Sequence, residues 1–577
     1  MLGKLLRGWL LLSLAVLPLA GQSGQGLGNS CGGPPGGQPS LFLDRPLQVG
    51  GQAVLGARNL TAPTLGWRVH GWEALYPGGI ALDGLGMTGC SLQVMPQFMV
   101  PFASGTGSAE WVVPLPQSAS LAGQSLFTQA FFFDPFANSA AVGATAGVAH
   151  EIEPQAARIR SVSSISQWGI TWVFERPVPA GRFVNGDWFV VGEAKIIDIL
   201  PRVTTSNGRT IHGAMLNPDP SVCDQGYDSR LYLGFGNHYQ PQLNVALSVS
   251  SQNPLFLEPG NRVIKAISLV PNQTHRSLRT ASVLTSLDEA PPMGSFRPPY
   301  AGPLRGAMFH EGMIQWSRLA SLPPAAGVPS IHEIASRIER VWLDHCPSWI
   351  GRIMHPLENM PDYGRDLSSL LGVAALLSNC DYPLKQRREL VIRLIQIGLD
   401  SYGNLRGGCR WAGDGGHSSG RKLPILFAGA MLGDQAMLAV GRDYRSQRTA
   451  NGVATAFFGE DSQTFYVEET SPGVINFGEG GYLPSDIGLP DWGVNHTTEP
   501  QNDSRSWYAN PYRRCCTANA WVGNVLVAHA MGLVPDWNHP PLFDYLDRYV
   551  AIEPLGWTRS WSSWAEAMWD QYRFQYP

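Results

Sequence analysis

The sequence is poor in charge for its length, and the charge that it carries is nearly balanced. Of 577 residues, 41 are Lys or Arg and 45 are Asp or Glu, which gives a formal net charge of −4. A general nucleic-acid-binding surface needs an excess of basic residues to neutralise phosphates, so the composition excludes that class of partner. The content of 44% hydrophobic residues is typical of a folded globular chain rather than a disordered one.

Long apolar runs are also scarce. At the N-terminus, Lys4 and Arg7 precede an apolar stretch from Trp9 to Leu19, a pattern that predicts a signal peptide over residues 1–23. No later run reaches the roughly 18 apolar residues that a transmembrane helix requires. We therefore expect a secreted or periplasmic/extracellular protein with no membrane span.

Sequence motifs for metals and cofactors are missing. The eight cysteines show no C-x-x-C spacing, no H-x-x-x-H occurs, and no G-x-x-x-x-G-K-[ST] phosphate loop is present. We predict neither a metal nor a cofactor. An exported chain encounters conditions that permit disulfides, and Cys31 and Cys90 are candidates for one. Adjacent Cys515 and Cys516 are expected to bond other partners or stay buried, because a bond between neighbours strains the backbone.

Glycine and proline, in contrast, are abundant, with 65 and 45 residues, and indicate many turns and a large β component. Short strand-like runs continue to about residue 290, and "NG" pairs at 185–186 and 207–208 predict hairpin turns. After a Pro-rich stretch the apolar period changes to one typical of helices. The fold class is multidomain β + α, with N-terminal β-sandwich modules followed by a helical-hairpin array or (α/α) toroid. The expected order is signal peptide (1–23), Gly/Pro linker (24–40), small β-sandwich (41–150), second β module (151–293), Pro-rich joint (294–305) and α-helical catalytic domain (306–577).

One stretch of the helical half, residues 410–434, combines chemistry with loose backbone. Its sequence, "RWAGDGGHSSGRKLPILFAGAMLGD", is glycine-rich and polar before it becomes apolar. Arg421 and Lys422 lie at the start of the expected helix, where the helix dipole favours an anion. His417 is the nearby side chain able to exchange a proton near neutral pH. The stretch predicts an anion site with a proton carrier beside it; the alternative is a glycine-rich helix entry whose cations are only solvated.

Four further loops of this half concentrate polar and aromatic residues, and loops of this length inside a compact domain are usually functional. They read "FFGEDSQTFYVEE", "LPDWGVNHTTEPQNDSRSW", "WYANPYRRCCTANAW" and, more weakly, "MPDYGRD". We expect them to meet the 410–434 stretch at one cleft. Their candidate residues are Tyr466, Trp492, Asn495, His496, Tyr512 and Arg514, with Tyr363 and Arg365 in the weaker segment.

On these residue types and this architecture, residues 300–577 loosely resemble the polysaccharide lyases that join an (α/α) toroid to β-sandwich domains, such as alginate and heparinoid lyases, although the β modules here precede the helices instead of following them. The resemblance implies β-elimination at a uronate of an acidic polysaccharide, with the carboxylate neutralised and the C5 proton removed by a Tyr or His. Arg421, Arg514 or Asn495 would neutralise the carboxylate. His417, His496 or Tyr466 would serve as the base. Trp492 and Tyr512 would contact the substrate.

Two other functions stay open at this point. A glycoside hydrolase would need two carboxylates, for which Asp414, Glu460, Asp461, Glu468 and Asp491 are candidates. A non-enzymatic extracellular glycan-binding or surface protein would use the same loops only for binding. The sequence does not indicate an oligomeric state.

Overall fold

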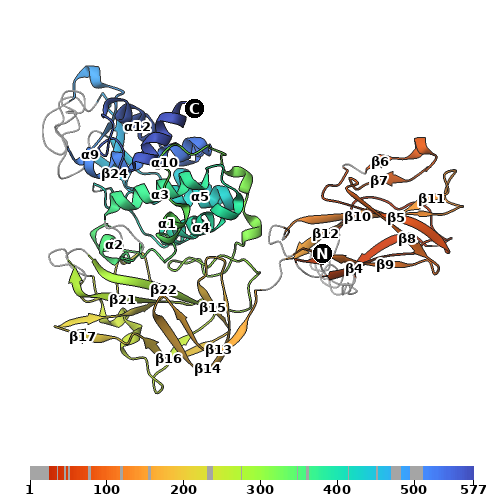
Figure 1. Ribbon diagram of the computed structural model, residues 1–577, viewed down its shortest axis with the longest axis horizontal. Coiled ribbons are helices and arrows are strands. Elements are labelled where there is room, and N and C mark those ends of the chain that lie inside the picture. Colours follow the sequence, from red (N-terminus) through yellow and green to blue (C-terminus); the bar gives the residue numbers. More distant parts are fainter. Residues whose placement is uncertain are drawn as a thin grey trace, which may run out of the picture. The chain divides into compact units, whose positions relative to one another are not determined.

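The structure is a computed structural model of the chain. It describes residues 25–35, 37–43, 47–49, 52–75, 79–116, 121, 123–153, 157–230, 238–273, 276–346, 348–358, 363–413, 415–449, 452–469, 482–493 and 511–576. The expected signal peptide lies outside the described residues. The chain divides into two compact units, Met1–Ala156 and Ala157–Pro577 (Figure 1). The multidomain β + α class is confirmed.

The N-terminal unit consists of two facing β-sheets, in agreement with the predicted sandwich. Trp111 of the smaller sheet stacks on Phe102 and lies under the guanidinium of Arg68, both from the larger sheet. The larger sheet has the order β1 (Gln25–Gly26), β12 (Val148–Glu153), β10 (Ser125–Phe133), β5 (Thr64–Gly71) and β8 (Phe98–Ser104), with β11 (Val142–Ala144) beside β10 and β3 (Leu47–Gln48) beside β12. The smaller sheet contains β2 (Ser40–Leu43), β4 (Gln52–Arg58) and β9 (Ala109–Pro114), and a short hairpin joins β6 (Ile80–Ala81) to β7 (Ser91–Leu92).

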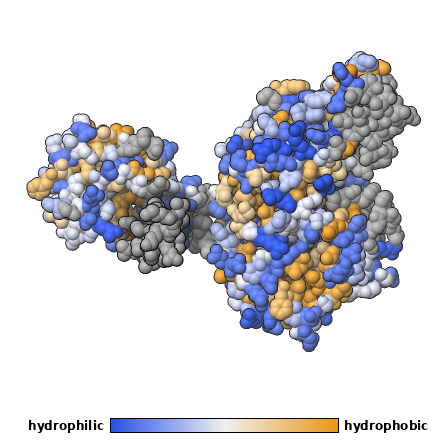
Figure 2. Space-filling model, turned by 180° about the vertical axis from the view of Figure 1, so that it is seen from behind, coloured by the Kyte–Doolittle hydropathy of each residue, from blue (hydrophilic) through white to orange (hydrophobic). Residues whose placement is uncertain are grey.

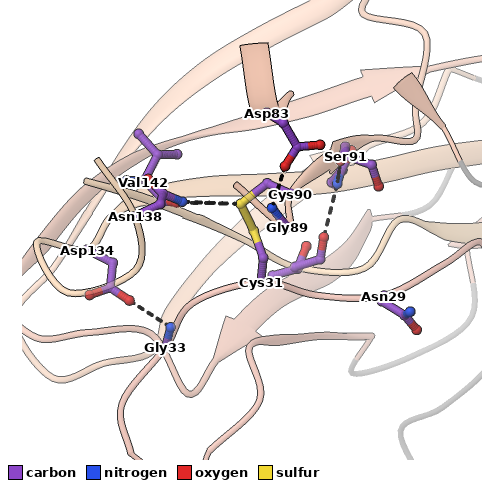
Figure 3. The surroundings of a disulfide bond; sticks show 12 residues. Asn29, Cys31, Gly33, Asp83, Gly89, Cys90, Ser91, Asp134, Asn138 and Val142 are labelled. Atoms are coloured by element: carbon purple, nitrogen blue, oxygen red, sulfur yellow. Dashed lines mark hydrogen bonds between the residues drawn. A yellow bond between two sulfur atoms is a disulfide. The ribbon is translucent and has the colours of Figure 1, made fainter. Parts of the chain in front are cut away.

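A disulfide joins Cys31 to Cys90, as predicted, and these two residues are 59 positions apart in the sequence. Figure 3 shows the local hydrogen bonds around it, in which the Asn138 side-chain amide donates to the Cys90 sulfur at 3.6 Å. Nearby, the Gly33 amide donates to the carboxylate of Asp134 at 2.7 Å. The bond therefore fastens the start of the described chain to the segment that carries β6 and β7.

Part of the larger sheet's outer face is apolar and uncovered within this unit. Leu65 and Trp67 of β5 are 68% and 53% exposed, and Phe133 of β10 is 52% exposed. With Val142 they line an open pocket of about 600 Å³. Apolar side chains are visible among polar ones on the surface of this unit (Figure 2). No charged side chain lines this pocket, so it differs in chemistry from the anion site that the sequence predicted elsewhere.

The second unit begins with an eight-stranded sheet. The "NG" pair at 207–208 forms the predicted hairpin turn between β17 and β18, with φ of 50° at Asn207 and 75° at Gly208. Both values suit a two-residue hairpin turn. The sheet order is β19 (Ala214–Leu216), β21 (Arg262–Gln273), β22 (Arg276–Leu287), β15 (Trp188–Val191), β14 (Ile170–Arg182), β16 (Ala194–Leu200) and β20 (Leu255–Leu257), with β13 (Arg160–Gln167) beside β14; β17 is Thr204–Ser206 and β18 is Arg209–Ile211.

The helices follow the sheet and pack closely at glycines. A Cβ on Gly372 of α3 would lie 3.0 Å from the backbone nitrogen of Asn524 in α10. A Cβ on Gly398 of α4 would lie 2.1 Å from the backbone carbonyl oxygen of Pro424 in α5. These positions let α3 approach α10 and α4 approach α5. The helices are α1 (Ile331–Ser336), α2 (Ser348–Met354), α3 (Gly364–Ser378), α4 (Leu384–Arg406), α5 (Lys422–Leu432), α6 (Gln435–Leu438), α7 (Val440–Asp443), α9 (Pro511–Cys516), α10 (Ala518–Ala530), α11 (Val534–Trp537), α12 (Pro540–Ile552) and α13 (Ser563–Tyr572). Two small two-stranded sheets lie between α7 and α9, formed by β23 (Gln447–Thr449) with β24 (Gly452–Thr455) and by β25 (Thr464–Tyr466) with β26 (Pro490–Trp492).

The Pro-rich segment 294–305 connects the sheet to the helices, but it is not an exposed joint. The Arg297 side chain is 1% exposed and bonds two carboxylates, Asp187 at 2.7 Å and Asp400 at 2.6 Å. Asp187 precedes β15 and Asp400 belongs to α4. A buried ion triad thus links the sheet to the helices, and residues 157–577 form one compact unit. Burial alone would lower the pKa of Arg297, but the two carboxylates outweigh it and raise the pKa.

Within the described part of the chain, no helix combines the length and the apolar character needed to cross a bilayer.

Candidate functional site

The loops that carry the predicted site residues pack against one another. The Gly413 amide donates to the Ser462 hydroxyl at 2.8 Å, and the Gln463 side-chain amide donates to the Gly415 carbonyl at 3.0 Å. The Gly493 amide in turn donates to the Gln463 carbonyl at 2.9 Å. The structure therefore brings together the 410–434 stretch, the loop before β25 and the end of β26.

The end of α9 joins the same group through close backbone contact. A Cβ on Gly416 would lie 2.3 Å from the Cys516 carbonyl oxygen and 2.7 Å from the Tyr363 ring. Gly364, the first residue of α3, lies equally close to the Gly416 carbonyl, since its Cβ would come within 1.6 Å of that oxygen. Only glycine fits these two positions, and their close approach places His417 next to Tyr363.

The two cations at the start of α5, Arg421 and Lys422, are buried and paired, which differs from the anion site that the sequence predicted. Every residue from 415 to 432 is buried. The Arg421 guanidinium donates to both Asp344 oxygens, at 2.7 and 3.0 Å, and to the Ser419 carbonyl at 2.6 Å. Because protein groups hold the guanidinium, Arg421 does not face a uronate in this structure. Arg421 and Asp344 are 77 positions apart in the sequence, which explains why no local pattern revealed this pair.

Asp344 also contacts His355, whose ring nitrogen lies 3.0 Å from the carboxylate. Burial disfavours the charged form of Asp344 and would raise its pKa. The positive charge of Arg421 and the hydrogen bond from His355 outweigh burial, and they hold the pKa of Asp344 well below the usual range. Lys422 is held in a similar way by Asp461 at 2.5 Å and by the Trp537 carbonyl at 2.6 Å. These ion pairs anchor the start of α5 in the core.

His417 and Tyr363 form the part of the loop cluster that carries catalytic residue types close to solvent. The two rings meet edge to face, with centroids 4.9 Å apart. His417 is 5% exposed, whereas Tyr363 is partly exposed. The Gly416 amide lies 3.4 Å from the Tyr363 hydroxyl oxygen, to which it donates. His417 is thus the inner member of the pair, and Tyr363 is the outer one.

Two arginines lie over the Tyr363 ring. The guanidinium carbon of Arg352, from α2, is 5.2 Å from the ring centroid, and that of Arg365, from α3, is 5.5 Å away. Arg365 also donates to the Asp366 carboxylate at 3.0 Å and to the Cys515 carbonyl at 2.7 Å, and it stacks on Trp561 at 3.6 Å. The local sequence marks Tyr363 and Arg365 only as part of the weaker segment, and nothing in it marks Arg352.

Cys515 and Cys516 form a disulfide with each other, which corrects the expectation that neighbours would not pair. Their Cα atoms are 3.8 Å apart, the ordinary spacing across a trans peptide, so the bond closes without a cis linkage. The pair ends α9 directly before α10 and lies where Arg365 and Gly416 contact the chain. It therefore belongs to the wall of the Tyr363–His417 site.

The remaining described candidates point elsewhere. The Tyr466 hydroxyl donates to the Asp544 carboxylate, and burial together with this carboxylate raises the pKa of Tyr466. A tyrosine with a raised pKa is a poor base, so Tyr466 does not suit the role predicted for it. Trp492 is fully buried beneath Arg513. Arg514 bonds the buried Glu553 at 2.7 Å.

Three predicted residues cannot be assigned positions at the site. Asn495 and His496 lie outside the described residues. Tyr512 belongs to α9, but its side chain lies outside the described part as well.

The carboxylates considered for hydrolysis are mostly interior. Glu460 accepts the Gly420 amide at 3.1 Å, and burial, reinforced by the Asp461 charge, raises its pKa to about 7. Asp491 accepts the Tyr482 hydroxyl at 3.0 Å, and burial raises its pKa to about 6 against the opposing effect of Arg513. Glu468 is exposed, and Asp414 lies outside the described residues. Among the described residues, no cluster of three or more His, Cys, Asp or Glu side chains has a geometry that would hold a metal.

Comparisons with known proteins do not assign a family. No family model matches the chain, and no curated protein does. Among solved structures, the chain can be aligned with Escherichia coli alpha-2-macroglobulin activated by porcine elastase, at 10% identity and a TM-score of 0.16. The alignment covers 92% of this chain and 50% of that one, so the chain spans half the length of that protein. A TM-score this low carries no argument about fold or function.

Proposed function

We propose that the chain is an exported polysaccharide lyase that cleaves a uronate-containing polysaccharide by β-elimination, with Tyr363 as its acid–base residue. The observation that carries the proposal is the position of the Tyr363 ring, partly exposed and overlaid by the guanidinium groups of Arg352 and Arg365. His417 packs edge-on against the same ring and would fix its orientation.

The chemistry of β-elimination matches these groups. Removal of the C5 proton leaves negative charge on the uronate carboxylate, and preorganised donors stabilise such charge. A guanidinium presents a planar fork that fits a carboxylate. Arg352 and Arg365 would fill this role in place of Arg421, because both are partly exposed, and Arg365 would bind the uronate alongside its bonds to Asp366 and the Cys515 carbonyl. Tyr363 would accept the C5 proton. The protonated Tyr363 would then return that proton to the leaving glycosidic oxygen.

Aromatic side chains beside the site suit a sugar chain. Trp557 and Trp561 are 59% and 39% exposed, and their rings meet edge to face at 6.4 Å. Arg365 stacks on Trp561, so the apolar platform and the positive charge are adjacent. Flat aromatic faces pack well against sugar rings, and the arginines would recognise the acid groups of the same polymer. A helical-hairpin array or (α/α) toroid remains the arrangement that we propose for the helical region.

The hydrolase alternative has less support. Glu460, Asp461 and Asp491 are each about 1% exposed or less, and protein groups bind all three. Carboxylates held in this way do not reach a polymer without rearrangement of the core. We therefore do not propose hydrolysis.

The test is incubation of the protein with a panel of uronate-containing and neutral polysaccharides, with two readouts. Ultraviolet absorbance reports the double bond that elimination creates, and a reducing-end assay reports every cleavage. We expect both signals, on uronate polymers only. Reducing ends without the absorbance would establish hydrolysis instead, and retention of a polymer without either signal would establish a binding protein.

A matched pair of arginine variants tests the site itself. Arg365→Gln removes the charge but keeps a donor for the Cys515 carbonyl, and it should lower turnover about a hundredfold, the usual scale for one lost charge-stabilising donor. Arg388→Gln is the control, since Arg388 pairs with Glu311 on the surface of α4. Equal activity of the two variants would remove Arg365 from the site.

A further inference from the structure

Four cysteines of the second unit carry thiols, and three of them lie together. Cys223 is partly exposed, whereas Cys346 and Cys409 are buried. The Cys346 thiol donates to the carbonyl of Asp224, the residue after Cys223, at 3.5 Å, and Cys223 packs against the apolar cluster that contains Cys346. The fourth thiol, Cys380, bonds the Leu376 carbonyl within its own helix and lies apart from this group.

The two sulfurs come from different layers of the unit. Cys223 follows β19 in the sheet region and packs against the apolar cluster that contains Cys346. Cys346 directly precedes α2 and lies two residues after Asp344, the partner of Arg421. A covalent bond between them would tie the sheet to the segment that anchors the start of α5.

We propose that Cys223 and Cys346 form a disulfide when the protein meets a thiol oxidant of the glutathione-disulfide class, and that this bond locks the Asp344 segment to the sheet. The packing of Cys223 against the cluster of Cys346, and the bond from the Cys346 thiol to the residue after Cys223, carry this inference. It does not depend on the lyase proposal. Exported proteins commonly meet oxidising conditions, in which such pairs close.

The reaction runs in two balanced steps. The Cys223 thiolate attacks one sulfur of glutathione disulfide, forming a mixed disulfide and releasing one glutathione thiolate. The Cys346 sulfur then attacks the Cys223 sulfur, which closes the protein disulfide and releases the second glutathione. The two cysteines lose two electrons and two protons, and the two glutathione molecules gain them.

Accessibility and charge assign the order of these steps. Cys223 is the more exposed thiol, and its hydrogen bond from Cys346 lowers its pKa against the opposing effect of burial. Burial raises the pKa of Cys346, which makes it the slower nucleophile and the resolving one. Cys409, whose sulfur lies 3.5 Å from the Asp344 carbonyl, is the competing partner for Cys346.

Tryptic mapping of the full-length chain tests the proposal directly. The protein is treated with glutathione disulfide, denatured, alkylated without reduction and digested. Trypsin places Cys223 in the peptide 210–230, Cys346 in 341–352, Cys409 in 407–410 and Cys380 in 366–385, with one cysteine in each. We expect 210–230 linked to 341–352, and loss of both alkylated peptides, while 366–385 stays alkylated.

Three results would overturn the proposal. The first is alkylation of both peptides, 210–230 and 341–352, after oxidation. The second is a glutathione adduct that persists on Cys223 alone. The third is a disulfide between peptides 341–352 and 407–410. Two variants extend the test to the lock. Oxidation should raise the melting temperature of the wild type and of Cys380→Ser, but not that of Cys223→Ser. An equal rise in Cys223→Ser would show that the bond, if formed, does not stabilise the segment.

Discussion

Replacing Arg421 with methionine tests whether this cation stabilises the fold or binds the substrate. The side chains of Arg421 and Asp344 are 3% and 4% exposed, and the guanidinium donates to both carboxylate oxygens. Arg421→Met removes one partner and leaves the Asp344 charge buried with only His355 beside it. Loss of one member of a buried ion pair typically costs about 3–5 kcal/mol of the free energy of unfolding.

This magnitude translates into a measurable change in melting temperature. The compact unit that contains the pair has about 420 residues, and unfolding entropy amounts to about 2.1 cal/mol/K per residue. A loss of about 3–5 kcal/mol therefore corresponds to a drop of about 3–6 °C in calorimetry. Arg442→Met is the matched control, because Arg442 pairs with Asp443 on the surface with 74% and 49% exposure. Such exposed pairs contribute about 0–1 kcal/mol.

The pH dependence gives a second check on the same variant. The folded-state pKa of Asp344 lies below its unfolded value of about 3.9, so the carboxylate contributes stability that is fully present above about pH 4. This contribution is lost as the pH falls further, and the difference between wild type and Arg421→Met should shrink there. An Arg421→Met protein that melts like the wild type but has lost activity would refute the structural role and restore Arg421 as a substrate ligand.

Three further variants test other parts of the structure. Because the pKa of Glu460 is raised to about 7, the folded state retains a proton between about pH 4.5 and 7 that the unfolded state releases, so the melting temperature should fall as the pH rises across that window. Glu460→Gln should flatten this fall. An unchanged slope in the variant would contradict the burial of Glu460. Gly416→Ala should lower both melting temperature and activity because its Cβ would meet the Cys516 carbonyl, whereas Gly84→Ala, with open space at its Cβ, should change neither; a tolerated Gly416→Ala would contradict the close approach. Arg297→Met should destabilise the second unit by about 3–5 kcal/mol in calorimetry, since two buried carboxylates lose their cation, and a neutral result would show that the triad does not hold the sheet to the helices.

The regular elements could be predicted because their signals are local. The Asn207–Gly208 pair marks a hairpin turn by its own backbone preference. Asp366, close to the first apolar residue of its segment, marks a helix start, and the Tyr363 amide donates to its carboxylate at 3.2 Å. The order of strands before helices follows from the change in apolar period in the same way.

The site could be predicted only in part because its partners are distant in sequence. The glycine-rich and polar loops pack against one another, but Tyr466 and Arg514 bond Asp544 and Glu553 instead of joining His417. The predicted cleft is therefore not established by these side chains, and His496 lies outside the described residues. Which side chain faces solvent depends on contacts such as Arg421 with Asp344, 77 residues away, and no local pattern contains them. The same reasoning overrated Tyr466, whose pKa is raised by Asp544, 78 residues further along the chain.

Turnover of the Tyr363→Phe variant on a uronate polymer is the most direct test of the proposed function. Loss of the hydroxyl removes the acid–base group and should cut formation of the unsaturated product by at least about a hundredfold, with little change in melting temperature. Tyr466→Phe, which loses a hydroxyl bound to Asp544 outside the Tyr363–His417 pair, should retain wild-type turnover. A fully active Tyr363→Phe protein, or an inactive Tyr466→Phe protein with unchanged melting, would contradict the assignment of the site.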